Sequence, residues 1–237
     1  NAEHRLQGRT DRPLSDEGCA EVSGWRVPDD YKSFEWVSSP LSRAQQTAEI
    51  LSLDIARLEP AIIEMDWGDW EGHTRAELDE IYGDEVSKRA ALGLDLRPHN
   101  GESPRDVRER VAEWAREVAE SGVPIGAVCH QGIIRAALSL ATGWSMVGKP
   151  PEKMDWASVH IFNAHADGTE HAGSLVDEGV GEGNVGRDER LLDRDDRGHL
   201  PLGEKSAQGV LESRLRPEVG LGRARGGHDG RRAVARR

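Results

Sequence analysis

The segment of residues 124–143 constrains the fold of this 237-residue chain more than any other part of it. A short apolar run at 125–128 is followed by the more polar residues 129–132. Apolar residues at helical spacing then continue from 133 to a glycine at 143. This order predicts a buried strand, a tight turn and a helix. Ligands of open α/β sheets bind beyond the carboxyl ends of strands. His130 is predicted at such an edge, either as a ligand-binding residue or as a histidine that only caps the strand.

The length of the chain suits one sizeable domain with or without a tail. No apolar run approaches transmembrane length, and no signal-like segment leads the sequence. The two cysteines, Cys19 and Cys129, are too few for a disulfide framework or a four-ligand zinc site. We therefore expect buried, reduced thiols in a cytoplasmic protein without a membrane partner.

The net charge of −12 is unevenly distributed. Residues 187–237 carry 13 basic and 9 acidic side chains, so the preceding residues carry −16. Such an acidic domain argues against a nucleic-acid-binding surface. A local cationic pocket for an anionic substrate remains compatible with it.

Alternating strand and helix patterns extend through the first 162 residues or so. Residues 34–38 and 156–162 are predicted strands, and 61–65 a short strand or extended segment. Four capped helices are also predicted, their caps being Ser15, Ser39 (before Pro40), Thr74 (in a capping box with Glu77) and Ser103 (before Pro104).

The composition changes after about residue 173, where Gly, Asp, Glu and Arg dominate without any apolar period. Such a segment buries too little apolar surface to offset its ordering entropy, so 173–237 is predicted to be a disordered tail after a domain at 1–172. The Arg- and Gly-rich end, 220–237, could bind nucleic acid or an anionic surface. An extension without function, or a frameshifted or read-through end, is the favoured interpretation.

Two charged residues stand out near predicted element ends. Arg43 lies in the first turn of a helix, where an arginine is reasonable if the same helix end receives an anion. The alternative is an ordinary surface ion pair. Glu64 precedes an aromatic turn with Trp67 and Trp70, which could raise its pKa and make it a proton donor. It could equally be a solvated acid in an acid-rich turn.

Taken together, these motifs resemble the histidine phosphatase superfamily (phosphoglycerate mutase-like), in order and spacing, from residue 1 to about 162. The residues that carry the resemblance are Asn1, Arg5, Leu6, Gln7, Gly8, Arg9, Thr10, Asp11, Pro13, Leu14, Ser15, Gly18, Ser38, Ser39, Pro40, Leu41, Arg43, Ala44, Gln46, Thr47, Ala48, Glu64, Gly68, Trp70, Glu71, Gly72, Gly101, Glu102, Ser103, Val128, His130 and Gly132.

The resemblance implies a three-layer α/β/α sandwich with a mostly parallel sheet, and phosphomonoester hydrolysis through a phosphohistidine. It implies that Arg43, His130 and Asn1 bind phosphate, that Glu64 protonates the leaving oxygen, and that Gln7 faces the substrate. The only partner expected is a small phosphorylated substrate. No metal or other cofactor is expected, because arginine and histidine supply the positive charge.

One motif of the family is not found in these 237 residues. The Arg-His-Gly that carries the nucleophilic histidine is expected just before Asn1, its histidine six positions upstream, together with most of the first, central strand. Residues 1–237 are therefore expected to be inactive and to leave unpaired edges in the sheet, while a full-length parent is expected to be a phosphatase. Cys129 is a poor substitute, since it points away from His130 if the strand alternates.

The remaining question is which reaction such a site serves. Residues 71–100 are too few to hold the long basic insertion of cofactor-dependent mutases, so hydrolysis is favoured over phosphoglycerate mutase-type phosphotransfer. A noncatalytic phosphate-ester-binding pseudoenzyme is the alternative from another class. Which phosphomonoester is the substrate stays open.

Overall fold

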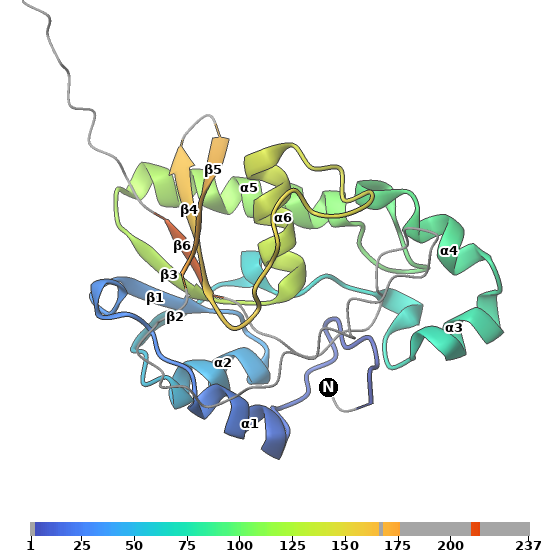
Figure 1. Cartoon of the computed structure of the whole chain (residues 1–237), viewed down its shortest axis with the longest axis horizontal. Coiled ribbons are helices and arrows are strands. Elements are labelled where there is room, and N and C mark those ends of the chain that lie inside the picture. Colours follow the sequence, from blue (N-terminus) through green and yellow to red (C-terminus); the bar gives the residue numbers. More distant parts are fainter. Residues whose placement is uncertain (1–2, 166–167, 176–209, 214–237) are drawn as a thin grey trace, which may run out of the picture.

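A mixed sheet with strand order β2-β1-β3-β6-β4-β5 forms the centre of the computed structural model, which describes residues 3–165, 168–175 and 210–213 (Figure 1). The strands are β1 (Glu35–Ser38), β2 (Ile55–Leu58), β3 (Ile125–Val128), β4 (Val159–His165), β5 (Gly168–Leu175) and β6 (Val210–Ser213). The helices are α1 (Asp16–Ser23), α2 (Ser42–Ile50), α3 (Arg75–Tyr82), α4 (Glu85–Ala90), α5 (Pro104–Ser121) and α6 (Gln131–Thr142).

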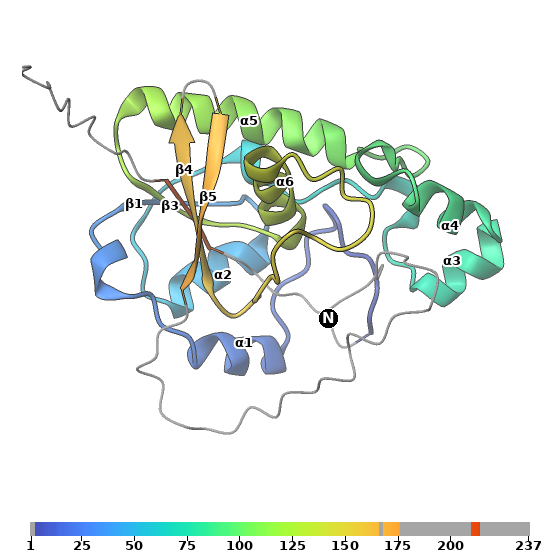
Figure 2. The ribbon, with the colours of Figure 1, turned by 45° about the horizontal axis from the view of Figure 1, so that its top comes forward.

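Each face of the sheet has its own hydrophobic core, because successive side chains of a strand point to opposite faces. Trp36 of β1 packs with Ala44 and Ala48 of α2, whereas its neighbour Val37 belongs to the core that includes Ile134 of α6. Figures 1 and 2 show α1 and α2 on one side of the sheet and α5 and α6 on the other. The three-layer α/β/α architecture is thus confirmed.

Strand direction follows the expected pattern for most of the sheet. β1 pairs in parallel with β2 and β3, and β4 pairs in parallel with β6. The β3–β6 and β4–β5 pairs are antiparallel. The sheet is therefore mixed, and the parallel strands β1 and β3 place their carboxyl ends at one edge, where the next residues of the chain carry the candidate site.

Local sequence rules predicted most helix ends correctly. Thr74 forms a capping box with Glu77, and Ser103 forms one with Asp106. α6 ends at Gly143 in the left-handed conformation, with φ of 72°. Each of these ends is fixed by residues within four positions in sequence, so the sequence contains all the information needed.

The start of α2 differs from the prediction. The helix begins at Ser42 rather than at Pro40, and its cap residue is Leu41, whose side chain makes no capping hydrogen bond. Asp11 performs the capping instead, since its carboxylate accepts hydrogen bonds from the amide of Ser42 at 2.7 Å and from its hydroxyl at 2.8 Å. A cap supplied from another segment is invisible to local sequence rules.

The predicted strands differ in detail from those observed. The last predicted strand, 156–162, begins at residue 159 and continues to residue 165. Residues 61–65 contain the end of a 3-10 helix (Pro60–Ile62) and irregular backbone, not a strand. β2 was not predicted, because its residues are mostly exposed and carry no apolar alternation.

The predicted boundary at 172 falls inside β5, which runs to Leu175. Four residues of the predicted tail, Val210–Ser213, form β6 between β3 and β4. The expectation that the strands beside the absent first strand keep unpaired edges is therefore wrong for β3 and β4, because β6 pairs with both. The rest of 173–237, including 220–237, lies outside the described residues.

The backbone of Gly126 in β3 packs so closely against the indole of Trp36 that any side chain at position 126 would clash with it. A Cβ at this position would lie 2.5 Å from the indole of Trp36, which is 2 % exposed and donates a hydrogen bond to the carbonyl of Tyr31. The indole is buried and held by this hydrogen bond, so overpacking is expected to destabilise the fold.

We expect Gly126→Ala to lower the free energy of unfolding by about 1–3 kcal/mol, measured by urea denaturation. Gly18→Ala in α1 is the matched control, because a Cβ there meets atoms only at 3.4 Å or beyond. That control should be neutral or slightly stabilising. Equal unfolding midpoints for the two variants would contradict the steric argument.

Candidate active site

His130 lies two residues after the end of β3 and occupies the cap position of α6. It is 3 % exposed, and its Nε2 lies 2.7 Å from the hydroxyl oxygen of Ser39. Burial lowers the pKa of His130 well below its usual value, and the charges of Arg43 and Arg110 lower it further. The imidazole is therefore neutral at pH 7 until an anion arrives to stabilise its charged form.

Arg43 lies in the first turn of α2 and is 4 % exposed. Its guanidinium donates hydrogen bonds to the carbonyls of Gly8 at 2.7 Å and Thr10 at 3.1 Å. Burial lowers its pKa, although Glu64 and other acids oppose this shift. A buried arginine stays charged, so Arg43 places a fixed positive charge beside His130.

Glu64 is partly buried in the irregular segment before the 3-10 helix Gly68–Trp70. One carboxyl oxygen accepts a hydrogen bond from the amide of Met65 at 2.8 Å, and the other lies 3.3 Å from the amide of Gly132 in the first turn of α6. Burial is the main cause that raises the pKa of Glu64, and Arg43 and Arg110 oppose it. A raised pKa is what a proton donor near neutral pH requires.

These three side chains come from distant parts of the sequence but lie close enough to influence one another's charge. Arg43 affects the pKa of both Glu64 and His130, and Glu64 contacts the helix that His130 caps. The site thus holds a fixed cation, a neutral imidazole and a carboxyl group with raised pKa. Such a set can bind an anion and protonate a leaving group.

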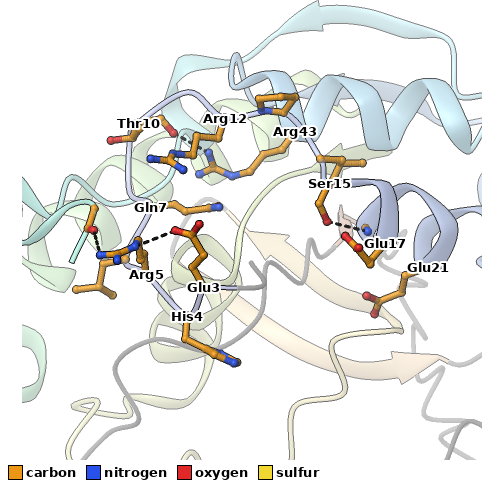
Figure 3. Close-up of a pocket in the computed structure, with 15 residues that line it drawn as sticks. Glu3, His4, Arg5, Gln7, Thr10, Arg12, Ser15, Glu17, Glu21 and Arg43 are labelled. Carbon is orange, nitrogen blue, oxygen red and sulfur yellow. Dashed lines mark hydrogen bonds and ion pairs between the residues drawn. The ribbon is translucent and has the colours of Figure 1, made fainter. Parts of the chain in front are cut away.

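A cavity of about 790 Å³ opens beside Arg43 (Figure 3). Gln7 and Arg43 line it together with Arg12, and Glu17 and Glu21 of α1 lie across it. His130 and Glu64 are not among its lining residues. Of Arg43, Glu64 and His130, only Arg43 therefore lines the cavity. Asn1 lies outside the described residues.

The loop that lines this cavity is held by Glu71. Its carboxylate accepts hydrogen bonds from the backbone amides of Arg9 at 2.7 Å and Thr10 at 2.8 Å, and from the amide of Trp67 at 3.2 Å. Gly8 precedes these amides and packs against the same carboxylate. The carbonyls that bind Arg43 are thereby fixed in place.

Sequence reasoning missed two residues that contact the site. Ser39 was expected to cap a helix, but its hydroxyl lies against His130. Arg110 of α5 donates hydrogen bonds to backbone carbonyls around Glu64. It falls on the helix face of Val107 and Trp114, and a charged residue in that apolar stripe was the available indication.

Cys129 offers no alternative nucleophile. It is fully buried in the core, and burial raises the pKa of its thiol far above the usual range. Cys19 is partly exposed, which differs from the expected burial.

Within the described parts of the chain, no cluster of three or more His, Cys, Asp or Glu side chains could hold a metal ion. The same parts contain no helix long and apolar enough to cross a membrane.

Comparison with known proteins links this geometry to one family. The sequence model of the histidine phosphatase superfamily (branch 1) matches residues 1–174. Glucosyl-3-phosphoglycerate phosphatase of Mycobacterium tuberculosis (strain ATCC 25618 / H37Rv) is 36 % identical over 162 residues, covering 60 % of this chain and 69 % of that protein. The 2,3-bisphosphoglycerate-dependent phosphoglycerate mutase 2 of Gloeobacter violaceus is 28 % identical over 184 residues, covering 71 % and 82 %.

Solved structures agree with the sequence comparisons. The complex of mycobacterial glucosyl-3-phosphoglycerate phosphatase with inorganic phosphate superposes with a TM-score of 0.51 at 27 % identity. That match covers 61 % of this chain and 78 % of the other. Both phosphatases and mutases are thus relatives of this chain, which fits a site built around a bound phosphoryl group.

Proposed function

The chain belongs to the histidine phosphatase superfamily (branch 1), and we propose that its site serves hydrolysis of a small phosphomonoester through a phosphohistidine. The observation that carries the proposal is the grouping of Arg43 after β1, His130 after β3 and Glu64 from the irregular segment after β2, whose charges affect one another. In this proposal Arg43 and His130 bind the phosphoryl oxygens, Gln7 contacts the rest of the substrate, and Asn1 adds a phosphate contact.

The reaction would run in two steps. In the first, a histidine nitrogen of an Arg-His-Gly motif forms a bond to phosphorus, the P–O bond to the alcohol breaks, and Glu64 gives its proton to the leaving oxygen. In the second, water attacks phosphorus, the N–P bond breaks, and the Glu64 carboxylate accepts a proton of that water. Arg43 and His130 balance the charge that develops on the phosphoryl oxygens.

The nucleophilic histidine is the part of this chemistry that the 237 residues do not contain, since Arg-His-Gly does not occur among them. In this proposal neither nearby candidate is the nucleophile, because Cys129 is buried with a raised thiol pKa and His130 is assigned as a phosphate ligand. We therefore define the extended polypeptide as residues 1–237 preceded by a strand-forming segment with Arg-His-Gly, its histidine six positions before Asn1.

Hydrolysis is proposed over mutase-type phosphotransfer because of the segment after Glu71. Residues 73–100 form only α3, α4 and a 3-10 helix (Gly93–Asp95). In Figure 1, α3 and α4 lie together at the right-hand end of the molecule, away from the strands of the sheet. A mutase must retain its released intermediate for a second phosphoryl transfer, whereas a phosphatase admits water.

We expect the extended polypeptide to release inorganic phosphate from p-nitrophenyl phosphate and residues 1–237 alone to release none. Substrate labelled at phosphorus should leave an acid-labile label on the extended polypeptide only. Turnover by residues 1–237 that is lost on changing His130 or Glu64 would overturn the assignment of the nucleophile. Phosphate binding without turnover by the extended polypeptide would favour the pseudoenzyme, and transfer to an added phosphoglycerate would favour the mutase.

A further inference from the structure

The backbone that presents Glu64 is unusual because no strand or helix holds it. Residues 63–66 lie in irregular structure between two 3-10 helices. An irregular segment with free carbonyls is expected to be mobile unless other groups take those carbonyls. A proton donor on such a segment needs an external support.

Arg110 contacts one backbone carbonyl just before this segment and two within it. Its guanidinium donates hydrogen bonds to the carbonyls of Ala61, of Ile63 at 2.6 Å and of Glu64 at 3.3 Å. The side chain is only 18 % exposed and projects from α5, an 18-residue helix with a capping box at its start. The planar guanidinium of Arg110 therefore links the irregular segment 63–66 to the helix α5.

Glu102 holds Arg110 and completes the support. One of its carboxylate oxygens lies 3.4 Å from Arg110 and accepts a hydrogen bond from the amide of Asp66 at 3.0 Å. The other accepts a hydrogen bond from Arg9 at 2.7 Å, and Arg9 also reaches the carbonyl of Glu64 at 3.4 Å. The Arg9–Glu102–Arg110 network thus surrounds the Glu64 backbone.

We propose that Arg110, held by Glu102, is a positioning residue that fixes the direction in which Glu64 presents its carboxyl group to the leaving oxygen. This inference rests on the proposed function, in which Glu64 is the proton donor. In this proposal Arg110 acts through the backbone carbonyls of Ile63 and Glu64 and not on the substrate. Its contribution is the geometry of a group that must donate along one direction, and small misplacements of such a group are costly.

The choice of substrate separates this role from a purely structural one. p-Nitrophenolate leaves as a stable anion and needs little proton transfer, whereas the alcohol of glycerol 3-phosphate needs a proton as the P–O bond breaks. In the extended polypeptide, Arg110→Met is expected to lower kcat/KM for glycerol 3-phosphate about 10–100-fold and for p-nitrophenyl phosphate less than about 3-fold. Equal losses on both substrates, or no loss, would overturn the inference.

Two further variants define what Arg110 contributes. Arg110→Lys keeps the charge but replaces the planar fork, whose two terminal nitrogens bind different carbonyls, with a single nitrogen, so it should show the same dependence on the leaving group as Arg110→Met. Arg116→Met removes an exposed arginine of α5 and should leave both substrates unaffected. Full activity of Arg110→Lys with glycerol 3-phosphate would show that charge matters rather than geometry, and would contradict positioning.

A measurement on residues 1–237 tests the same inference without catalysis. The amide of Gly132 lies 3.3 Å from the Glu64 carboxylate, so its hydrogen exchange reports where that carboxylate is held. Arg110→Met and Arg110→Lys should speed exchange of this amide about tenfold relative to the amide of Leu138 in the same helix. Unchanged exchange would refute positioning, whereas inactivity of the unsubstituted extended polypeptide would refute only the proposed function.

Discussion

Replacing Glu64 with glutamine in the extended polypeptide is expected to lower kcat/KM for an alkyl phosphate by about 10²–10⁴-fold. Glutamine has nearly the same shape but no proton to donate to the leaving oxygen. Its amide group must also face one of the two backbone amides, of Met65 or Gly132, that now point at carboxylate oxygens. Glu80→Gln, on the exposed surface of α3, is the matched control and should change nothing.

The pH dependence gives a second result for the same variant. Burial raises the pKa of Glu64, so the protonated, donating form persists to higher pH than for an ordinary carboxyl group. The alkyl phosphatase activity should fall as pH rises through this pKa, and Glu64→Gln should lose that fall. A variant with the same activity and the same alkaline limb would show that another group donates the proton.

The raised pKa also has a consequence for stability. Because the folded chain holds the Glu64 proton to a higher pH than the unfolded chain does, the free energy of unfolding falls as pH rises from the unfolded pKa towards the folded one. Glu64→Gln removes this contribution. Above the folded pKa, the partly buried Glu64 carboxylate therefore lowers the free energy of unfolding. Such a destabilising group is expected for a functional rather than a structural acid.

The parts of the site that sequence alone could predict are those fixed by local structure. His130 follows from a four-residue buried strand and the helix after it, and that strand and helix are both observed. Arg43 was predicted in the first helical turn, and it lies there even though the helix starts two residues later than expected. Each placement depends on neighbours in sequence, whose periodicity and caps can be read directly.

The parts that could not be predicted depend on contacts between distant segments. Asp11 caps α2 from a loop 31 residues earlier, which frees Ser39 to contact His130. Arg110 reaches carbonyls 46 to 49 residues away. Burial decides the charge state of Glu64, since alone its sequence context fits a solvated acid equally well. No local pattern encodes such contacts, because they form only after the layers pack.

β6 is the clearest case of structure decided by the rest of the fold. Its four residues belong to a region whose composition predicts disorder, yet their backbone pairs with β3 on one side and β4 on the other. Two strands that face each other across an open position offer unsatisfied amides and carbonyls along both edges. A short strand there satisfies both rows at once, so pairing outweighs a weak local preference.

Leu211 lies in the middle of β6, opposite Ala127 of β3 and His160 of β4, and Leu211→Pro is therefore expected to lower the free energy of unfolding by about 3 kcal/mol. Proline removes the backbone N–H and leaves its partner carbonyl unpaired inside the sheet. Leu211→Ala keeps the N–H and is the matched control. The difference between the two variants in the free energy of unfolding, measured by urea denaturation, therefore reports the loss of the backbone hydrogen bond.

The damage from Leu211→Pro should extend to the candidate site, because β3 pairs with β6 at Gly126–Val128 and His130 follows only two residues later. A loosened β3 would let the imidazole leave Ser39 and lose its position beside Arg43. Inorganic phosphate should therefore bind residues 1–237 more weakly in Leu211→Pro than in Leu211→Ala, as measured by calorimetry. Identical unfolding and identical phosphate affinity in the two variants would mean that β6 supports neither the sheet nor the site.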